Sequence, residues 1–176
     1  GFKASGMENK LRVGLTAFLI NWQGLQTFNL VAPFTYAREN LGDVQTKGIE
    51  FEGTIIPVKN LELDASLGLN SGKYQDFTLT RVNFATFAEE KVNVSDKKLT
   101  NAPTHTFFLA AQYGIPLTKT AKLSLRGEYR SVGEFYTDLQ NTLKQPSYSL
   151  INTRVNLQLI KFNVAFWVQN IGNTRY

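Results

Sequence analysis

Apolar and polar residues alternate one for one through several segments of this chain, and no other feature constrains its fold as strongly. Along residues 61–70 the odd positions are apolar, and the even positions are polar residues or glycine. Residues 123–130 and 162–169 repeat the alternation. Successive side chains of a β-strand point to opposite faces, so each segment predicts a strand with one apolar and one polar face. Long strands of this kind, with charges on one face, suit a barrel that stands in lipid around a wet lumen.

Period-two runs and turn residues together predict an all-β chain of about eight strands in an antiparallel up-and-down meander. The connections alternate in length. They are short at 6–9, 57–60, 116–121 and 160–161, and long at 23–43, 78–103 and 137–147. Short periplasmic turns and long extracellular loops are the layout of an outer-membrane barrel. The predicted strands are 1–5, 10–22, 44–56, 61–77, 104–115, 122–136, 148–160 and 162–176.

The apolar face of these strands is expected to point outward, away from the barrel axis, and the polar face inward. Lysines gather at the short turns, where they are either ordinary solvated turn residues or contacts for anionic phospholipid heads of the inner leaflet. The residues expected to face lipid are Leu61, Leu63, Leu67, Leu123, Leu125, Val164 and Phe166.

Composition excludes several function classes. The mean hydropathy is −0.20 and no apolar run approaches the length of a transmembrane helix. The absence of cysteine removes disulfides, thiol nucleophiles and thiolate metal sites. The net charge of +5 is not gathered into a stripe, so nucleic-acid binding is not predicted. The start at Gly1, without an initiator Met or leader, suggests a mature product or a fragment.

The chain offers no convincing catalytic constellation. His105 is the single histidine and has no cysteine partner. Glu50 and Glu52 have the same-face spacing of a carboxylate pair, but carboxylates are ordinary on the wet inner face of a barrel. We therefore predict no catalytic residue, no metal site and no cofactor.

Three motifs resemble segments of TonB-dependent outer-membrane receptors. Residues 47–53 (KGIEFEG) resemble the KGxExE strand of that family, and residues 101–105 (NAPTH) resemble the element that opens a later strand. Residues 166–176 (FWVQNIGNTRY) resemble the xNLxDxxY segment near the receptors' C-terminus, although Asn170-Ile171-Gly172 replaces the commoner Asn-Leu-Phe. The order and spacing of the three motifs extend the resemblance over nearly the whole chain.

The resemblance implies that residues 1–176 are part of the C-terminal half of a receptor barrel, with the plug domain and the closing strand outside the sequence. It implies uptake of a ferric siderophore or similar iron chelate across the outer membrane of a Gram-negative bacterium. Energy would arrive from TonB through the plug. Outer-membrane lipid and lipopolysaccharide would surround the barrel.

Two groups of side chains are candidates for function. Arginine and aromatic side chains suit a compact anionic chelate. The ligand-binding candidates at the long-loop end are therefore Tyr36, Arg38, Arg81 and Tyr136. The loop 78–103 is expected to fold over bound chelate as a lid. Arg126, Glu128 and Arg130 form a charged ladder on one strand face, which in a receptor would meet the plug.

Two alternatives stay open from the sequence. Eight strands also fit a self-contained barrel, either a small outer-membrane protein or a soluble lipocalin-like binder. A lipocalin, however, has an apolar interior and does not need long loops beside minimal turns. The second alternative is an aggregation-prone domain in which the alternation is incidental.

Overall fold

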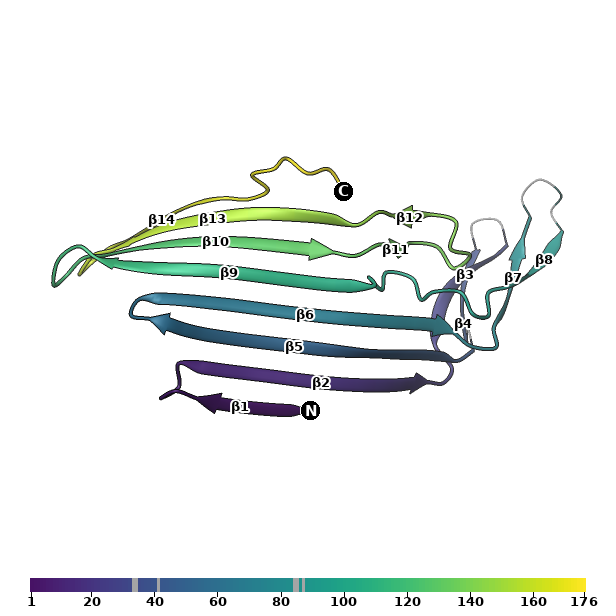
Figure 1. The fold of residues 1–176 in the computed structure, drawn as a ribbon. Helices are drawn as coiled ribbons and strands as arrows, with labels where there is room; N and C mark the ends of the chain where they lie inside the picture. The colour runs from purple at the N-terminus through teal and green to yellow at the C-terminus, as the bar shows by residue number, and fades with distance from the viewer. Residues whose placement is uncertain (33–34, 41, 84–85, 87) are drawn as a thin grey trace.

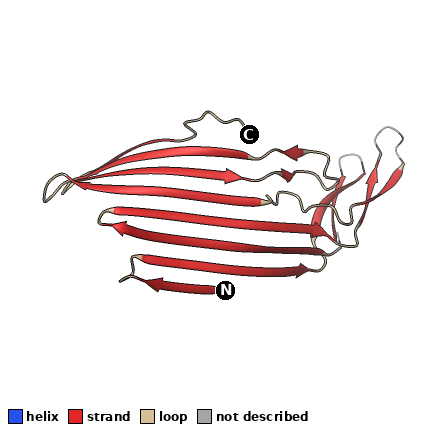
Figure 2. Cartoon of the chain, in the orientation of Figure 1, coloured by secondary structure: helices blue, strands red, loops and turns tan. Residues whose placement is uncertain are grey.

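The computed structural model describes residues 1–32, 35–40, 42–83, 86 and 88–176; at 27–32, 36, 37, 39, 40, 79 and 81 it describes the backbone without the side chain. Every regular element in this part of the chain is a β-strand, and Figure 2 shows the strands joined by turns and loops. No helix among the described residues is long and apolar enough to cross a membrane. The predicted all-β class is confirmed.

Eight strands form one antiparallel sheet, and neighbours in the sheet follow one another along the chain, separated only by turns or by the loops and their short ribbons (Figure 1). This is the predicted meander. The sheet is open: its edges are β1 and β14, which do not pair with each other, so the self-contained eight-stranded barrel is not what the described residues form. The strands are β1 (Phe2–Gly6), β2 (Leu11–Trp22), β5 (Val44–Val58), β6 (Leu61–Tyr74), β9 (His105–Pro116), β10 (Lys122–Val132), β13 (Tyr148–Gln158) and β14 (Asn163–Val168).

The pairing register gathers the apolar side chains of neighbouring strands into rows on one face. One such row crosses the sheet through Leu15, Phe51, Leu67 and Phe107. Many of these side chains are exposed, and an exposed apolar face of this extent marks a surface that meets lipid or another apolar partner. The register confirms that the residues expected to face lipid share this face: Leu61, Leu63, Leu67, Leu123, Leu125, Val164 and Phe166.

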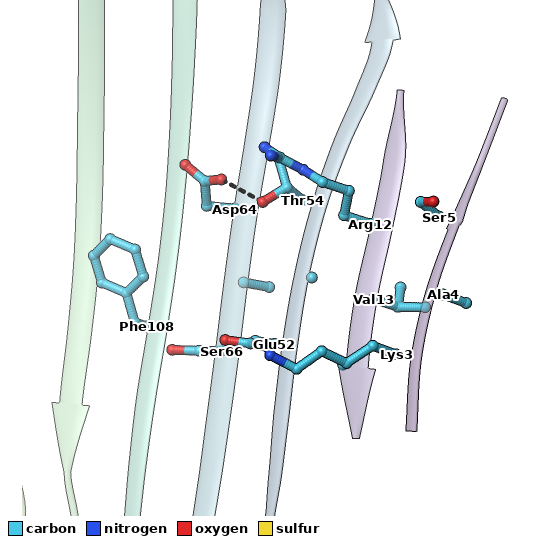
Figure 3. A pocket seen from close by; sticks show the side chains of 13 residues that line it. Lys3, Ala4, Ser5, Arg12, Val13, Glu52, Thr54, Asp64, Ser66 and Phe108 are labelled. Carbon is cyan, nitrogen blue, oxygen red and sulfur yellow. Dashed lines mark hydrogen bonds and ion pairs between the residues drawn. The ribbon is translucent and has the colours of Figure 1, made fainter. Parts of the chain in front are cut away.

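The opposite face of the sheet is polar and hollowed. Figure 3 shows one hollow, where Lys3, Arg12, Glu52 and Asp64 project from β1, β2, β5 and β6. A second hollow lies over β10, β13 and β14, beside Glu128 and Asn152. Both hollows lie on the polar side, which in a membrane-spanning barrel is the side that faces the lumen.

Two predicted strands end earlier than the alternation suggested, since β6 stops at Tyr74 and β10 at Val132. The predicted strand 162–176 is wrong over most of its length, because β14 ends at Val168. Beyond it, Asn170 takes a left-handed backbone with φ of 52°. Its side chain then closes a turn: Asn170 Nδ2 donates to the Thr174 carbonyl, and the Thr174 N–H donates to Asn170 Oδ1, both at 2.9 Å. Local side-chain bonding here replaces the strand ladder.

The long loops contain three short ribbons that the alternation did not reveal. Each ribbon pairs two strands within one connection. The elements are β3 (Gln26–Ala32) with β4 (Thr35–Asn40), β7 (Thr78–Val82) with β8 (Glu89–Asn93), and β11 (Phe135–Tyr136) with β12 (Lys144–Gln145).

The buried core of the described residues lies at the long-loop end. Val44, Tyr74, Phe77 and Val94 are buried together, with Leu25, Val92, Leu99 and Leu139 packed around them. These residues belong to all three long connections or to the strand ends that lead into them. The loops are thus joined by a small hydrophobic core of their own above the sheet.

Candidate ligand-binding mouth and lumenal wall

The segment 94–104 is part of the wall rather than a free loop. On one side, the backbone N–H groups of Asp96 and Leu99 donate to carbonyls at the end of β6, both at 2.9 Å. On the other side, the Asn101 N–H donates to the carbonyl of Tyr136 at 2.8 Å. The segment therefore joins the end of β6 to β11 through backbone hydrogen bonds and extends the wall beyond the sheet.

Asp138 builds a tight turn in the loop that follows β11. Its carboxylate accepts hydrogen bonds from the backbone N–H groups of Thr142 and Leu143, at 2.9 and 2.7 Å, and from the Thr142 hydroxyl at 2.8 Å. Loss of solvent around Asp138 raises its pKa, but these hydrogen bonds lower the pKa by more, so the net value lies below that of an ordinary aspartate. The turn depends on the ionised carboxylate.

Two lysines flank Tyr136 at the mouth. Lys98 Nζ lies 5.7 Å from the centre of the Tyr136 ring, and Lys144 is paired with Tyr136 across the β11–β12 ribbon. Both ammonium groups form ion pairs with Glu134. The hydrogen bond with Lys144 lowers the pKa of Glu134 and raises the pKa of Lys144. Two ammonium groups on one carboxylate leave positive charge beside an aromatic ring, a combination that suits an anionic aromatic ligand.

Two hairpins extend outward beyond this anchored layer. β3 of the first hairpin contacts β7 of the second, and Figure 1 shows both at the same end of the sheet. The base of the β3–β4 hairpin carries Gly24 and Gly42, with φ of 63° and 85°. A side chain at Gly42 would also approach the Asp76 carbonyl to 2.9 Å, so this base requires glycine.

The structure locates the predicted mouth residues only in part. Tyr136 is half-buried beneath Lys98, and Arg38 is exposed on β4. The backbones of Tyr36 and Arg81 lie in β4 and β7, but their side chains lie outside the described residues. Convergence of the four side chains on one ligand stays a prediction.

The predicted lumenal ladder of β10 lies on one face, and it is largely paired within the wall. Arg126 Nε donates to Glu128 at 2.8 Å, and its Nη1 donates to Asp64 at 3.3 Å. The Thr54 hydroxyl donates to the other Asp64 oxygen at 3.0 Å (Figure 3). Arg130 is more exposed, and its guanidinium lies 3.8 Å from Glu128. Arg126 therefore ties β10 to β6. Arg130 also lies 5.1 Å from the centre of the Phe108 ring, but its more exposed guanidinium is accessible from the polar side of the sheet.

Asp64, Lys98 and Lys144 are partners that the sequence analysis missed. Asp64 reaches Arg126 across β9, which only the register of three strands reveals. Lys98 and Lys144 lie in loops without periodicity, so nothing in the sequence linked them to Tyr136. Within the described part of the chain, no group of three or more His, Asp and Glu residues could hold a metal ion.

Known proteins share this architecture. The family model of the TonB dependent receptor-like β-barrel matches residues 1–171. The ferric yersiniabactin uptake receptor FyuA from Yersinia pestis superposes with a TM-score of 0.77 at 16% identity, over 99% of this chain and 24% of that receptor. The siderophore receptor PiuA from Acinetobacter baumannii gives 0.71 at 17% identity, over 99% and 24%. The ferric-catecholate import receptor Fiu from E. coli gives 0.66 at 14% identity, over 99% and 22%.

The chain thus spans about a quarter of the length of these solved receptors. At such low identity the superpositions show the fold alone, whereas the family model covers nearly the entire sequence. That family consists of outer-membrane receptors of Gram-negative bacteria, as the motifs at residues 47–53, 101–105 and 166–176 suggested. The chain belongs to the TonB-dependent receptor β-barrel family.

Proposed function

We propose that this chain forms part of the barrel wall of an outer-membrane receptor that takes up a ferric siderophore or a similar iron chelate, energised through TonB. The observation that carries the proposal is the polarity of the sheet. Its outer face is apolar, its inner face is polar and hollowed, and interlocked loops stand at one end only. Such a wall moves a ligand without making or breaking a bond in it, so the protein acts as a receptor and not as an enzyme.

The open edges support a larger barrel. An unpaired β1 or β14 in the hydrocarbon would leave backbone N–H and C=O groups without partners, which lipid does not tolerate. Residues 1–176 are accordingly a partial barrel that flanking strands complete. In that barrel Arg130 meets the plug domain, through which TonB acts, while Arg126 and Glu128 mainly brace the wall.

The chelate enters at the long-loop end in this proposal. Tyr136 with Lys98 and Lys144 supplies an aromatic ring and positive charge, to which Tyr36, Arg38 and Arg81 add their side chains from the hairpins. The expected lid was the whole loop 78–103, but segment 94–104 is hydrogen-bonded into the wall. We therefore propose that only the β7–β8 hairpin of this loop closes over the chelate.

Lipopolysaccharide is the proposed neighbour of the outer border of the apolar face. There the outward positions change from Leu69 to Ser71 and Lys73 on β6, and Lys47 takes the corresponding border position on β5. Ammonium groups at that level suit the phosphates of lipopolysaccharide.

Uptake of radioactive iron tests the proposal in cells that lack other siderophore receptors and carry the full receptor that contains this segment. A panel of ferric siderophores is offered under iron limitation, with and without TonB. We expect TonB-dependent uptake of at least one chelate, reduced at least tenfold in affinity by Lys98→Gln with Lys144→Gln. The matched control removes the same charge through Lys97→Gln and Lys122→Gln. Uptake of none of the chelates would refute the proposed ligand class.

A further inference from the structure

The four short turns have a similar residue composition, to which the proposed receptor function assigns no role. Between the strand ends, at residues 7–10, 59–60, 117–121 and 159–162, each turn contains a single lysine, and Glu8 is the only acidic residue among them. Beside each lysine stands an exposed apolar side chain, with Met7, Val58, Leu117 and Ile160 between 52% and 76% exposed. We call these eight residues the basic rim: Met7, Lys10, Val58, Lys59, Leu117, Lys119, Ile160 and Lys161.

The basic rim lies directly at the lower border of the apolar face. Outward positions stay apolar down to the turns, ending with Leu11, Leu61, Ile115 and Leu123 on four of the strands. At the upper border, by contrast, Ser71 and Lys73 separate the apolar rows from the loops. If the apolar face occupies the hydrocarbon, the short turns therefore stand at the level of the phospholipid heads.

The rim lysines are available to a ligand. Among the described residues, Lys59, Lys119 and Lys161 make no ion pair, and Lys10 has only an exposed contact with Glu8 at 3.9 Å. Lys122 is different, because its side chain lies across Gly114 on the lumenal face. The opposite end of the sheet has no excess of positive charge, since the connections at 23–43, 75–104 and 133–147 carry eight acidic and six basic residues.

We propose that the basic rim binds anionic phospholipid headgroups of the inner leaflet. The exposed apolar side chains enter the boundary between heads and acyl chains, and the ammonium groups of Lys59, Lys119, Lys161 and Lys10 contact the lipid phosphates. Charge complementarity selects this occupant: the rim is cationic and continuous with the lipid-facing surface. The proposal rests on the membrane location of the proposed function, but not on the identity of the chelate.

Lipid selectivity measures the interaction directly. The full receptor is reconstituted in phosphatidylcholine bilayers, and spin-labelled phosphatidylglycerol and phosphatidylcholine are compared for their association with the barrel. We expect a severalfold preference for phosphatidylglycerol at low salt, weakened in about 1 M salt. In the variant Lys59→Gln, Lys119→Gln, Lys161→Gln the preference should fall toward one, because three of the four ammonium groups that attract the anionic headgroups are removed.

Two further variants separate charge from folding. Replacing the same three lysines by arginine should retain the preference, and so should the control Lys91→Gln, Lys97→Gln, Lys122→Gln, which removes three charges away from the rim. Equal preferences in the glutamine rim variant and the wild type would overturn the inference while leaving siderophore uptake untouched. If the glutamine rim variant keeps the wild-type lipid preference but no longer captures an acidic periplasmic protein, the rim binds a protein partner instead of lipid. Failure of the wild-type barrel to insert would overturn the membrane location as well.

Discussion

Asn141 holds the backbone of Lys98 from both sides, although 43 residues separate them in the sequence. The Lys98 N–H donates to Asn141 Oδ1 at 2.7 Å, and Asn141 Nδ2 donates to the Lys98 carbonyl at 3.0 Å. Asn141 adopts a left-handed φ of 57°, a conformation that asparagine tolerates better than most residues. One amide thus fixes two long loops to each other beside Tyr136.

Replacing Asn141 by Ala should loosen both loops. The substitution removes both hydrogen bonds to the Lys98 backbone and a third, longer one from Asn141 Nδ2 to the Asp138 carbonyl at 3.4 Å. We expect a local loss of about 1–3 kcal/mol. Hydrogen exchange should accelerate at Lys98 and Leu99 and in residues 138–143, with little change in the sheet. Leu143→Ala is the control, because that side chain is exposed while its backbone bonds persist. Unchanged exchange at Lys98 would show that the loops are held by other contacts.

The turn at Asp138 should be sensitive to acid. The folded pKa lies below the ordinary value of about 3.9, so the ionised carboxylate stabilises the turn above that value. This stabilisation is lost as the pH falls below about 4 and through the folded pKa. NMR shifts of the Thr142 and Leu143 amides should follow that titration. Asp138→Asn should show no such titration, and an identical pH profile in the variant would assign the effect to another group.

The sequence predicted the sheet well because each main strand has an independent two-residue period. Residues 61–70 alternate without error, and the register then places their apolar side chains in one row with those of β5 and β9. The short connections followed from the same pattern. The mouth was less predictable, since its fold depends on bonds between distant residues, such as Asn141 with Lys98, that leave no period in the sequence.

Two of the features that the alternation did not predict have a common physical origin. The ribbon β7–β8 and the turn at Asn170 are set by backbone pairing and side-chain capping within a few residues. Neither requires a long apolar row. The lumenal partner of Arg126 was hidden for a different reason, because Asp64 lies two strands away and only the register brings them together.

Lysine at Leu67 should distinguish the two faces of the wall. Leu67 lies in the middle of the apolar face, where a charge in the bilayer costs about 2–4 kcal/mol. Lysine at the adjacent Ser66, which lines the polar hollow near Glu52, should change the free energy of unfolding by less than about 1 kcal/mol. Urea unfolding of the full barrel in lipid vesicles measures both. Equal costs for the two variants would contradict a lipid-facing apolar surface.

Arg126→Ala should weaken the wall more than Arg130→Ala. Without Arg126 the half-buried Asp64 and Glu128 lose their shared partner and repel each other, a cost of about 1–3 kcal/mol. Arg130 is exposed and 3.8 Å from its partner, so its loss should cost less than about 1 kcal/mol of stability. If Arg130 meets the plug, its replacement should instead impair TonB-dependent uptake. The reverse order of stability losses would refute this division of roles.

Shortening the β7–β8 hairpin should impair ligand capture without unfolding the mouth. Residues 80–91 are replaced by Asn-Gly, a sequence that closes a two-residue hairpin. The change removes Arg81 but retains Val92 and Val94, which pack in the loop core. A lid slows escape of the ligand, so the dissociation rate of a ferric siderophore from cells should rise at least tenfold while the association rate changes little. Trypsin resistance of residues 94–104 reports whether the anchored segment stays folded. A normal dissociation rate in a folded variant would exclude the hairpin as the lid and assign retention of the chelate to the rest of the receptor.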